Sequence, residues 1–267
     1  MGSNPTLATK NSSSERFKIM LISLLITTFK RDHLLKHTLP TIKKQKLKHD
    51  LEVIVINDGT HDQTEQIAKE YGCKYIFTGH RNLDGEKWRV PGFAFNIGFK
   101  RSSGDIIILS CAEIYHIGNV LNKLIDPVLD DKLALGIPQG KDDNKLFLNA
   151  LESSGNNLIE IYNKLGNLNV KLPFLFSMHR SHYEKIRGYD EDFIGMAFDD
   201  RDFVDRLLDL NCHYVQTDAQ CVHLYHSRSS RPGRTRPLHE HNRQLYLSRK
   251  GIIVRNKGKE WGVLNEK

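Results

Sequence analysis

A short apolar run at residues 106–109 constrains most strongly what this chain can fold into. The run consists of three isoleucines and a leucine, it follows a Gly-Asp pair, and polar residues come directly after it. A run of this length with turn residues in front is typical of a strand buried on both faces. Ligands of open α/β sheets lie just beyond the carboxyl ends of such strands. We therefore expect Glu113 to lie at a binding site, or else to begin a solvated loop.

Three more apolar runs, with helical segments between them, indicate the class of fold. Strands are predicted at residues 17–27, 51–56 and 73–77, and helices at 32–46 and 61–71. Strand, helix, strand, helix, strand is the pattern of right-handed parallel crossovers. We expect an α/β fold with a Rossmann-like, mostly parallel central sheet flanked by helices. The glycine fingerprint G-x-G-x-x-G is missing, so the sequence does not support a dinucleotide site.

The second half of the chain gives weaker patterns. Residues 139–170 are rich in Asn, Lys and Gly, and only a helix near 157–165 is predicted there. The small polar residues 1–16 are typical of a disordered tail, and residues 238–267 are expected to form a helical tail. The other predicted elements are helices at 93–101, 117–135 and 199–210, and strands at 172–178 and 214–222.

Composition describes an ordinary globular protein with a basic surface. The chain has 267 residues, enough for one large α/β domain, and its net charge of +7 weakly favours a phosphate-bearing ligand or an acidic partner. Four cysteines, none in a C-x-x-C pair, are too few for a disulfide scaffold. No apolar run is long enough to span a bilayer, and no signal-peptide pattern is present. We expect a cytoplasmic protein, and peripheral contact with a membrane stays open.

Five polar clusters follow the apolar runs or open a helix. If the sheet is open and parallel, its strand ends bring such clusters to one edge. One cluster would mean little, but five favour a site. The clusters lie at residues 27–31, 57–60, 111–113, 199–202 and 223–226.

In order and spacing, these clusters resemble the motifs of the inverting family-two glycosyltransferases with the GT-A fold. Residues 27–31 are similar to the polar exit of that family's first strand, and residues 56–60 to its V-D-D-G-S turn. W-R-V-P-G at 88–92, followed by F-N-I-G at 95–98, is similar to its W-R-x-P-G…R-N-x-G segment.

The resemblance continues into the branch of the family that has a galactosyltransferase-like C-terminal half. G-Y-D-E-D-F at 188–193 is similar to G-G-F-D-E-x-F, and D-D-R-D-F at 199–203 to E-D-x-D-F. The resemblance implies a single GT-A domain over residues 17–237. Its nucleotide-binding half would cover residues 17–116, and its acceptor and catalytic half residues 117–237.

The resemblance implies a divalent metal, Mn or Mg. Where the family has Asp-x-Asp, with the last acid on the metal, this chain has Cys111-Ala112-Glu113. Glu113 can take the metal because carboxylate oxygens suit Mg and Mn, whereas Cys111 is a poor replacement for the first acid. His223 and His226 stand at metal-binding positions of the galactosyltransferase-like branch, and neutral imidazole is a good ligand for Mn. The alternative is that both histidines are structural or surface residues.

The resemblance also implies a site for a UDP-sugar. Asp58 would accept the imide N–H of uracil, or it would only form the turn before Gly59. Arg89 would bind the diphosphate or lie in solvent. Four arginines within residues 228–236 would form a loop that closes over the diphosphate, or a solvated basic loop. The other residues assigned to the nucleotide sugar are Thr27, Phe29, Arg31, Asn96, Cys111, Ala112 and Arg228.

Asp199 and Asp200 are the predicted catalytic pair. Inverting transfer needs a base that takes the proton of the attacking hydroxyl. By resemblance Asp200 is that base, and Asp199 would orient the acceptor. The alternative is that both acids only cap the helix that follows, and the two roles are compatible.

Taken together, the sequence predicts an inverting glycosyltransferase. It would move a hexose or N-acetylhexosamine from a UDP-sugar to a glycan, lipid-linked or protein acceptor. A non-catalytic module that binds a nucleotide sugar or a glycan is the alternative, and Cys111 favours it. A nucleic-acid-binding protein is favoured only by the basic charge, and the interleaved aromatics of a stacking platform are missing.

Overall fold

The computed structural model describes residues 19–79, 90–153, 156–227 and 232–264, the last with its side chains from residue 237 onward. The predicted tail at 1–16, Arg89, Arg228 and the other arginines assigned to the basic loop lie outside the residues or side chains described. The strands are β1 (Leu21–Thr28), β2 (Asp50–Asn57), β3 (Lys74–Phe77), β4 (Ile106–Cys111), β5 (Ile114–Ile117), β6 (Ala134–Asp142), β7 (Gly166–Asn167), β8 (Leu175–His179) and β9 (His213–His223). The helices are α1 (Asp32–Lys43), α2 (Thr64–Glu70), α3 (Pro91–Lys100), α4 (Val120–Asp130), α5 (Leu146–Glu152), α6 (Leu158–Lys164), α7 (Arg180–Ile186), α8 (Asp199–Leu208) and α9 (Pro232–Ser248).

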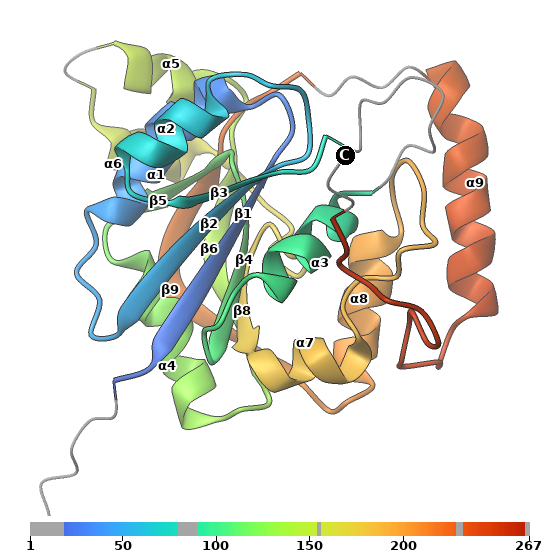
Figure 1. Cartoon of the computed structure of the whole chain (residues 1–267). Coiled ribbons are helices and arrows are strands. Elements are labelled where there is room, and N and C mark those ends of the chain that lie inside the picture. The colour runs from blue at the N-terminus through green and yellow to red at the C-terminus, as the bar shows by residue number, and fades with distance from the viewer. Residues whose placement is uncertain (1–18, 80–89, 154–155, 228–231, 265–267) are drawn as a thin grey trace, which may run out of the picture.

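All the described strands join one sheet in the order β3-β2-β1-β4-β8-β6-β9-β5, with β7 paired to β6 (Figure 1). The strands β3, β2, β1 and β4 are parallel neighbours. Because β8 is antiparallel to both β4 and β6, these two run the same way, and β9 is parallel to β6. Six strands therefore end at one edge. The predicted α/β sheet is confirmed, and the antiparallel strands β5, β7 and β8 make it a mixed one.

Helices cover both faces of the sheet (Figure 1). Alternate residues of a strand point to opposite faces, so Leu24 of β1 packs in the layer under α1, α2 and α4, and Leu25 packs in the layer under α3, α7 and α8. Both leucines are fully buried. The unbroken apolar runs of the central strands are thus explained by burial on two sides.

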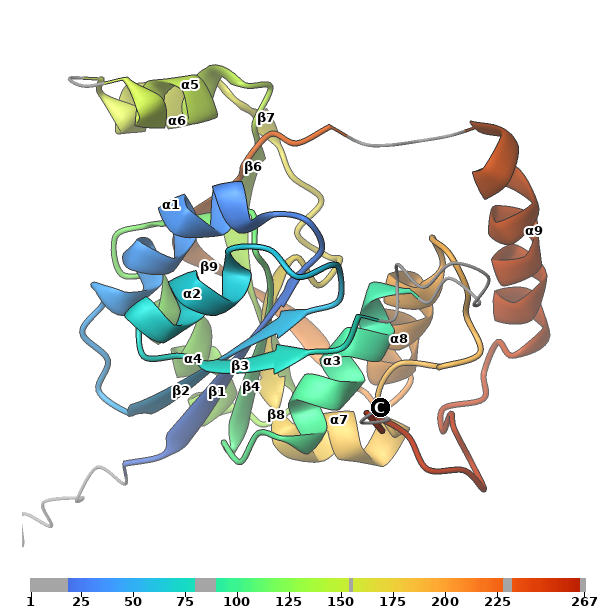
Figure 2. The same cartoon turned by 45° about the horizontal axis from the view of Figure 1, so that its top comes forward.

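The predicted helix at 117–135 is wrong at both ends. The chain still forms β5 at its start, α4 occupies only its middle, and β6 begins before its end. The ambiguous residues 139–170 hold the end of β6, α5, α6 and β7, and Figure 2 shows α5 and α6 projecting beyond the sheet.

The predicted helical tail at 238–267 is only partly helical, because α9 ends at Ser248. The described residues that follow it pack irregularly against the domain. There the Trp261 ring lies over Phe99, with ring centroids 5.8 Å apart, and it is almost fully buried. The last described residues therefore contribute to the same core as α3 and α7.

Candidate active site

Three side chains of types that can ligate a metal meet at the carboxyl edge of the sheet. Glu113 lies in the turn between β4 and β5, His223 ends β9, and His226 follows three residues later. The Glu113 Oε1 atom lies 3.7 Å from His223 Nε2 and 3.4 Å from His226 Nε2. One ligand atom from each of the three residues lies within 4.8 Å of the others. The structure thus brings together the three residues that the sequence proposes as metal ligands.

Strand pairing creates this meeting. Ile114 is the antiparallel partner of His223, and the Leu224 amide donates to the Glu113 carbonyl at 2.9 Å. The turn at Glu113 is therefore fixed against the end of β9. Glu113 directly precedes Ile114, and Ile114 pairs with His223, so the strand pairing brings Glu113 and His223 together.

The cluster is electrostatically paired. Burial alone would raise the pKa of Glu113, but hydrogen bonds and charge interactions with His223 and His226 lower it well below its usual range. Burial likewise opposes a charge on His223, yet hydrogen bonds to Glu113 and Asp142 raise the pKa of His223. Glu113 is therefore ionised at neutral pH and can serve as an anionic ligand.

Asp142 holds the ring of His223 in place. The His223 Nδ1 atom lies 2.9 Å from the Asp142 carboxylate at the end of β6. If Nδ1 carries the proton and donates it to this carboxylate, the lone pair of Nε2 faces Glu113. Metal-binding histidines are usually held in this way by an outer carboxylate. Glu113 and His223 thus fit a divalent ion as they stand.

His226 has a different outer partner. The Arg31 Nη2 atom lies 2.9 Å from His226 Nδ1. Because a guanidinium only donates hydrogen bonds, Nδ1 is the acceptor and the proton of a neutral ring lies on Nε2. A metal on Nε2 would need the opposite tautomer. His226 can therefore join a metal once Arg31 has moved away from it.

Asp58 lies at the same edge, at the end of β2. It is 1% exposed, and its carboxylate accepts a hydrogen bond from the Thr78 hydroxyl. The turn itself is built by Asn57, whose side-chain oxygen accepts from the Gly59 amide at 2.9 Å. The turn-forming role therefore belongs to Asn57. The contact of Asp58 with the base of the sugar nucleotide stays a prediction.

The other residues predicted to bind the nucleotide sugar differ in how exposed they are. Thr27 is buried near the end of β1, Phe29 is half-buried after it, and Lys30 stands over the Phe29 ring at 5.8 Å. Cys111 is half-buried and forms no disulfide. Arg31 contacts His226, one of the three predicted metal ligands.

Asn96 and Ala112 do not fit the donor site. The Asn96 side chain is 0% exposed; its amide nitrogen donates to Tyr189 O and Glu191 Oε1, and its oxygen accepts from the Tyr183 hydroxyl and the Tyr189 amide. These four hydrogen bonds use its whole capacity. Ala112 is fully buried, and its amide and carbonyl are taken by Thr27 and Thr38. Both predictions are corrected: these residues hold the fold around the site.

Asp199 and Asp200 begin α8. Burial and the neighbouring Asp199 carboxylate raise the pKa of Asp200 well above its ordinary value, while the hydrogen bond from the Tyr189 hydroxyl, 3.2 Å from Asp200 Oδ1, acts in the opposite direction. The residue at the cap position is Phe198, and no side chain caps the helix by a hydrogen bond. The acids therefore do not act as hydrogen-bonding caps, although they lie in the first turn, where the helix dipole favours them.

Three residues near the site were not found from the sequence: Asp142, Tyr189 and Thr78. Asp142 ends β6, and recognising that strand would have placed an acid at the carboxyl edge of the sheet. Tyr189 and Thr78 act through their hydroxyls on Asp200 and Asp58. Although Tyr189 lies in a matched motif, the motif does not reveal its contact with Asp200, because both contacts depend on how distant segments pack.

Comparison with known families identifies the chain. The sequence model of glycosyl transferase family 2 matches residues 23–187, which is more than half of the chain. The protein belongs to this family. A second model, described as the N-terminal domain of galactosyltransferase, matches residues 174–228 of this glycosyltransferase. Both parts of the resemblance noted in the sequence are thereby confirmed.

Curated relatives are similar over part of their length. The chain is 28% identical over 140 residues to a dolichol-phosphate mannosyltransferase of Pyrococcus furiosus, a match that covers 51% of this chain and 39% of the relative. It is 32% identical over 111 residues to an uncharacterized glycosyltransferase of Rickettsia typhi, covering 39% and 33%. The chain thus spans well under half of the curated relatives it matches.

Solved structures confirm the GT-A fold. GalNAc-T7 with UDP, GalNAc and Mn2+ superposes with a TM-score of 0.63 at 12% identity, covering 87% of this chain and 48% of that one. The mannosyltransferase PcManGT of Pyrobaculum calidifontis, with GDP-Man and Mn2+, gives 0.59 at 15%, covering 88% and 66%. S. aureus TarS gives 0.51 at 17%, covering 76% and 58%. At these identities the likeness concerns the fold. In the part of the chain that the structure describes, no helix is both long and apolar enough to cross a membrane.

Proposed function

We propose that this family-2 protein is a metal-dependent enzyme that transfers a hexose or N-acetylhexosamine from a UDP-sugar to a hydroxyl acceptor, with inversion. The observation that carries the proposal is the meeting of Glu113, His223 and His226 within 4.8 Å. They lie at the edge of the sheet where β2 presents Asp58. The acceptor would be a glycan, a lipid-linked sugar or a protein.

The metal would be held by Glu113 and His223, and by His226 after Arg31 has moved. When bound, a divalent ion stabilises the negative charge of the departing diphosphate. Arg31, once released from His226, is a guanidinium beside the same place and can donate to phosphate oxygens. Asp142 keeps His223 in the ligating orientation.

The choice of nucleotide involves Asp58. A buried carboxylate at the end of β2 can accept the imide N–H of uracil. Among the solved structures of similar fold, one contains UDP and another GDP-Man, so the fold accommodates both classes. Asp58 suits the imide N–H of uracil, and the family resemblance noted in the sequence is what favours UDP in this chain.

Asp200 would act as the general base. Because a base works best with a pKa near the working pH, the raised pKa of Asp200 suits it to take a proton from a sugar hydroxyl. The Tyr189 hydroxyl holds one oxygen of this carboxylate, so the other oxygen is available to the acceptor. Asp199, its neighbour, would orient the acceptor.

A second candidate is a module that binds a nucleotide sugar or a glycan without turnover. The observation that favours it is Cys111, a cysteine in place of the first acid of the family's Asp-x-Asp. Such a module would keep the donor site and lose transfer.

A screen of UDP-sugars tests the proposal. The protein is incubated with Mn and each of a series of UDP-hexoses and UDP-N-acetylhexosamines, with GDP-mannose as the comparison, and release of UDP or GDP is measured with and without glycan acceptors. We expect metal-dependent UDP release from one donor, and none in excess chelator. Tight UDP-sugar binding without release would favour the module, and release from GDP-mannose alone would overturn the assignment of UDP.

A further inference from the structure

The backbone directly before the catalytic pair adopts an unusual conformation. Ala197 and Phe198 have φ angles of 72° and 70°, and Gly195, two residues earlier, has 73°. Residues other than glycine rarely occupy this left-handed region, and for a bulky residue such as Phe198 it is strained. A strained segment of this kind persists only where its surroundings impose it.

One side chain of α9 holds the segment. Asn242 is 0% exposed, and its amide nitrogen donates to three carbonyls of the loop, those of Ile194 at 2.6 Å, Met196 at 2.9 Å and Ala197 at 3.1 Å. Its oxygen accepts from the Ile194 amide at 3.1 Å. A single side chain thus pairs with four backbone groups of the turn at 194–197.

Other residues of α9 close around the same turn. A Cβ atom at Gly195 would lie 2.6 Å from Leu238, so only glycine lets the loop approach the helix this closely. The Phe198 ring lies 5.0 Å from the His239 ring and 5.6 Å from the Tyr246 ring, centroid to centroid. Figures 1 and 2 show α9 standing beside α8 at the outside of the domain. Its inner side is therefore occupied by the loop that leads into α8.

We propose that Asn242 is a positioning residue for the transfer reaction, which fixes the turn at 194–198 so that Asp200 faces the acceptor. The proposal rests on the proposed role of Asp200 as base. Phe198 provides the first carbonyl of α8, which accepts from the Asp202 amide at 2.8 Å. The direction of the first helical turn, and of the Asp200 side chain on it, therefore depends on the conformation of Phe198.

This arrangement separates the base from the donor site. Glu113 and His223 are held by β4, β5 and β9, and none of the hydrogen bonds of Asn242 reaches these strands. Loss of the Asn242 amide should therefore disturb proton transfer and leave UDP and metal binding intact. A role that only stabilised the whole fold would weaken all of them together.

Three variants of the full chain test the placement of the loop. Asn242→Ala removes all four hydrogen bonds, and Asn242→Asp keeps the size and the acceptor but turns a carboxylate oxygen toward three carbonyls. Gln244→Ala, at an exposed position of the same helix, is the matched control. Hydrogen exchange followed by mass spectrometry should show faster exchange in peptides that cover residues 194–200 for both Asn242 variants, at temperatures well below their melting points. Unchanged exchange there would overturn the proposal whether or not the protein is active.

A double-mutant cycle with Asp200→Asn tests whether Asn242 affects turnover through Asp200. With the UDP-sugar that is turned over, we expect Asn242→Ala to lower turnover by about 10²-fold, the cost of a misplaced catalytic group, with UDP affinity unchanged. In the Asp200→Asn background the same change should cost almost nothing, because the two residues act through one base. Equal fractional losses in both backgrounds would show a structural role and refute the proposal. If Asp200→Asn alone has no effect, it is the assignment of the base that fails, and the exchange experiment still decides the role of Asn242.

Discussion

At the scale of single residues, the two histidines of the cluster differ in the atom that faces their Nδ1. His223 has the Asp142 carboxylate there and His226 has the Arg31 guanidinium. Removing the carboxylate should loosen His223, because outer partners of this kind contribute about 10–100-fold to metal affinity. We predict that Asp142→Ala weakens Mn binding by a factor in that range in calorimetry, and that Asp142→Asn, which keeps an oxygen acceptor, has a smaller effect. Mn affinity equal to wild type in a folded Asp142→Ala variant would remove His223 from the ligand set.

The Asp58 carboxylate can be tested in the same way with UDP. Asp58→Ala should weaken UDP binding by about 1–3 kcal/mol, the usual cost of losing a buried hydrogen-bond partner. Asp50→Ala, at the exposed start of the same strand, is the control and should bind UDP like wild type. Calorimetry with UDP and Mn decides the matter, and equal affinities of the two variants would exclude Asp58 from the donor site.

Asp200→Asn should separate catalysis from binding. The change keeps the size of the side chain and removes its basicity, so turnover should fall by about 10²–10⁴-fold while UDP-sugar affinity is kept. The pH–rate profile of wild type should rise through the raised pKa of Asp200, and this limb should disappear in the variant. A variant that transfers sugar at the wild-type rate would make Asp199 the next candidate.

The pH dependence of the free energy of unfolding provides a second test of Asp200. Its pKa is raised in the folded state, so the stability contributed by the protonated carboxyl is present at acid pH and is lost as pH rises through the folded pKa. Asparagine does not titrate. The variant should therefore gain free energy of unfolding over wild type at neutral pH, and the gain should shrink toward the ordinary carboxyl pKa of 3.8. Loss of stability at neutral pH would instead indicate a structural, helix-end role.

The sequence predicts three metal ligands that the structure brings together, and its predictions fail where packing decides. Glu113, His223 and His226 follow apolar runs and match metal-binding positions of the resembled family. Asn96 also lies in a matched motif, but its four hydrogen bonds are internal. Whether an amide faces a ligand or the fold depends on what lies opposite it, and that is not a property of the local sequence.

At the scale of elements, the strands buried on both faces were predicted and the irregular ones were not. β6 contains Gly136, Pro138 and Gly140, residues that argue against a strand. Its pairing with β9 shifts register between Ile137 and Gln139, so Pro138 lies at an irregularity where its missing N–H costs little. β5 has only four residues, and it exists because β9 pairs with it. Neither β5 nor β6 could therefore be predicted from hydrophobic periodicity.

Glu52 ties four segments of the N-terminal part together. Its carboxylate accepts from Ser23 of β1, Lys74 of β3 and the Ser103 amide, each at 2.6 Å. Burial opposes the charge, but these hydrogen bonds lower the pKa of Glu52 to about 2 from 4.5. The carboxylate therefore stabilises the fold above pH 4.5, and this contribution is lost as pH falls toward 2.

We predict that Glu52→Gln lowers the free energy of unfolding at pH 7 by about 1–3 kcal/mol, since hydrogen bonds to a buried charge are lost. Urea melts at two pH values provide the measurement, and the difference from wild type should shrink at pH 3. Glu65→Gln, whose partner Lys69 forms an exposed pair on α2, is the control and should change little. A deficit that stays constant on acidification would show that the glutamine itself disturbs the site.

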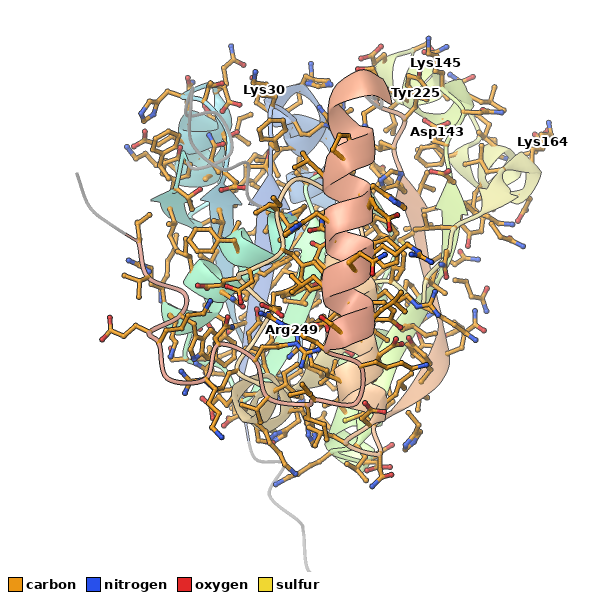
Figure 3. The ribbon with its side chains drawn as sticks, turned by 90° about the vertical axis from the view of Figure 1, so that its right-hand side faces the viewer. Lys30, Asp143, Lys145, Lys164, Tyr225 and Arg249 are labelled. Atoms are coloured by element: carbon orange, nitrogen blue, oxygen red, sulfur yellow. The ribbon has the colours of Figure 1, made fainter. Side chains whose placement is uncertain are left out.

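At the scale of the whole molecule, the residues after α9 are part of the core. Arg249, directly after α9 (Figure 3), pairs with Asp190 at 2.5 Å. The Trp261 ring stacks with the rings of Phe99 and Tyr183. Trp261→Ala should therefore destabilise the protein by about 3–5 kcal/mol, as truncations of large buried aromatics do. Val263→Ala, at an exposed position nearby, is the control for urea unfolding. Equal midpoints for the two variants would show that the segment adds nothing to the core.

The pairing of β5 with β9 also has a consequence for how the chain reaches its native state. Ile114 and His223 are partners although roughly a hundred residues separate them, and contacts between such distant segments form slowly because a long loop must close first. The three proposed metal ligands lie in or next to these same two strands. Manganese should consequently have little affinity for a chain whose β5 and β9 have not yet met. Manganese should therefore slow unfolding far more than it speeds folding. The ion would stabilise the pairing of β5 with β9 only after that pairing has formed.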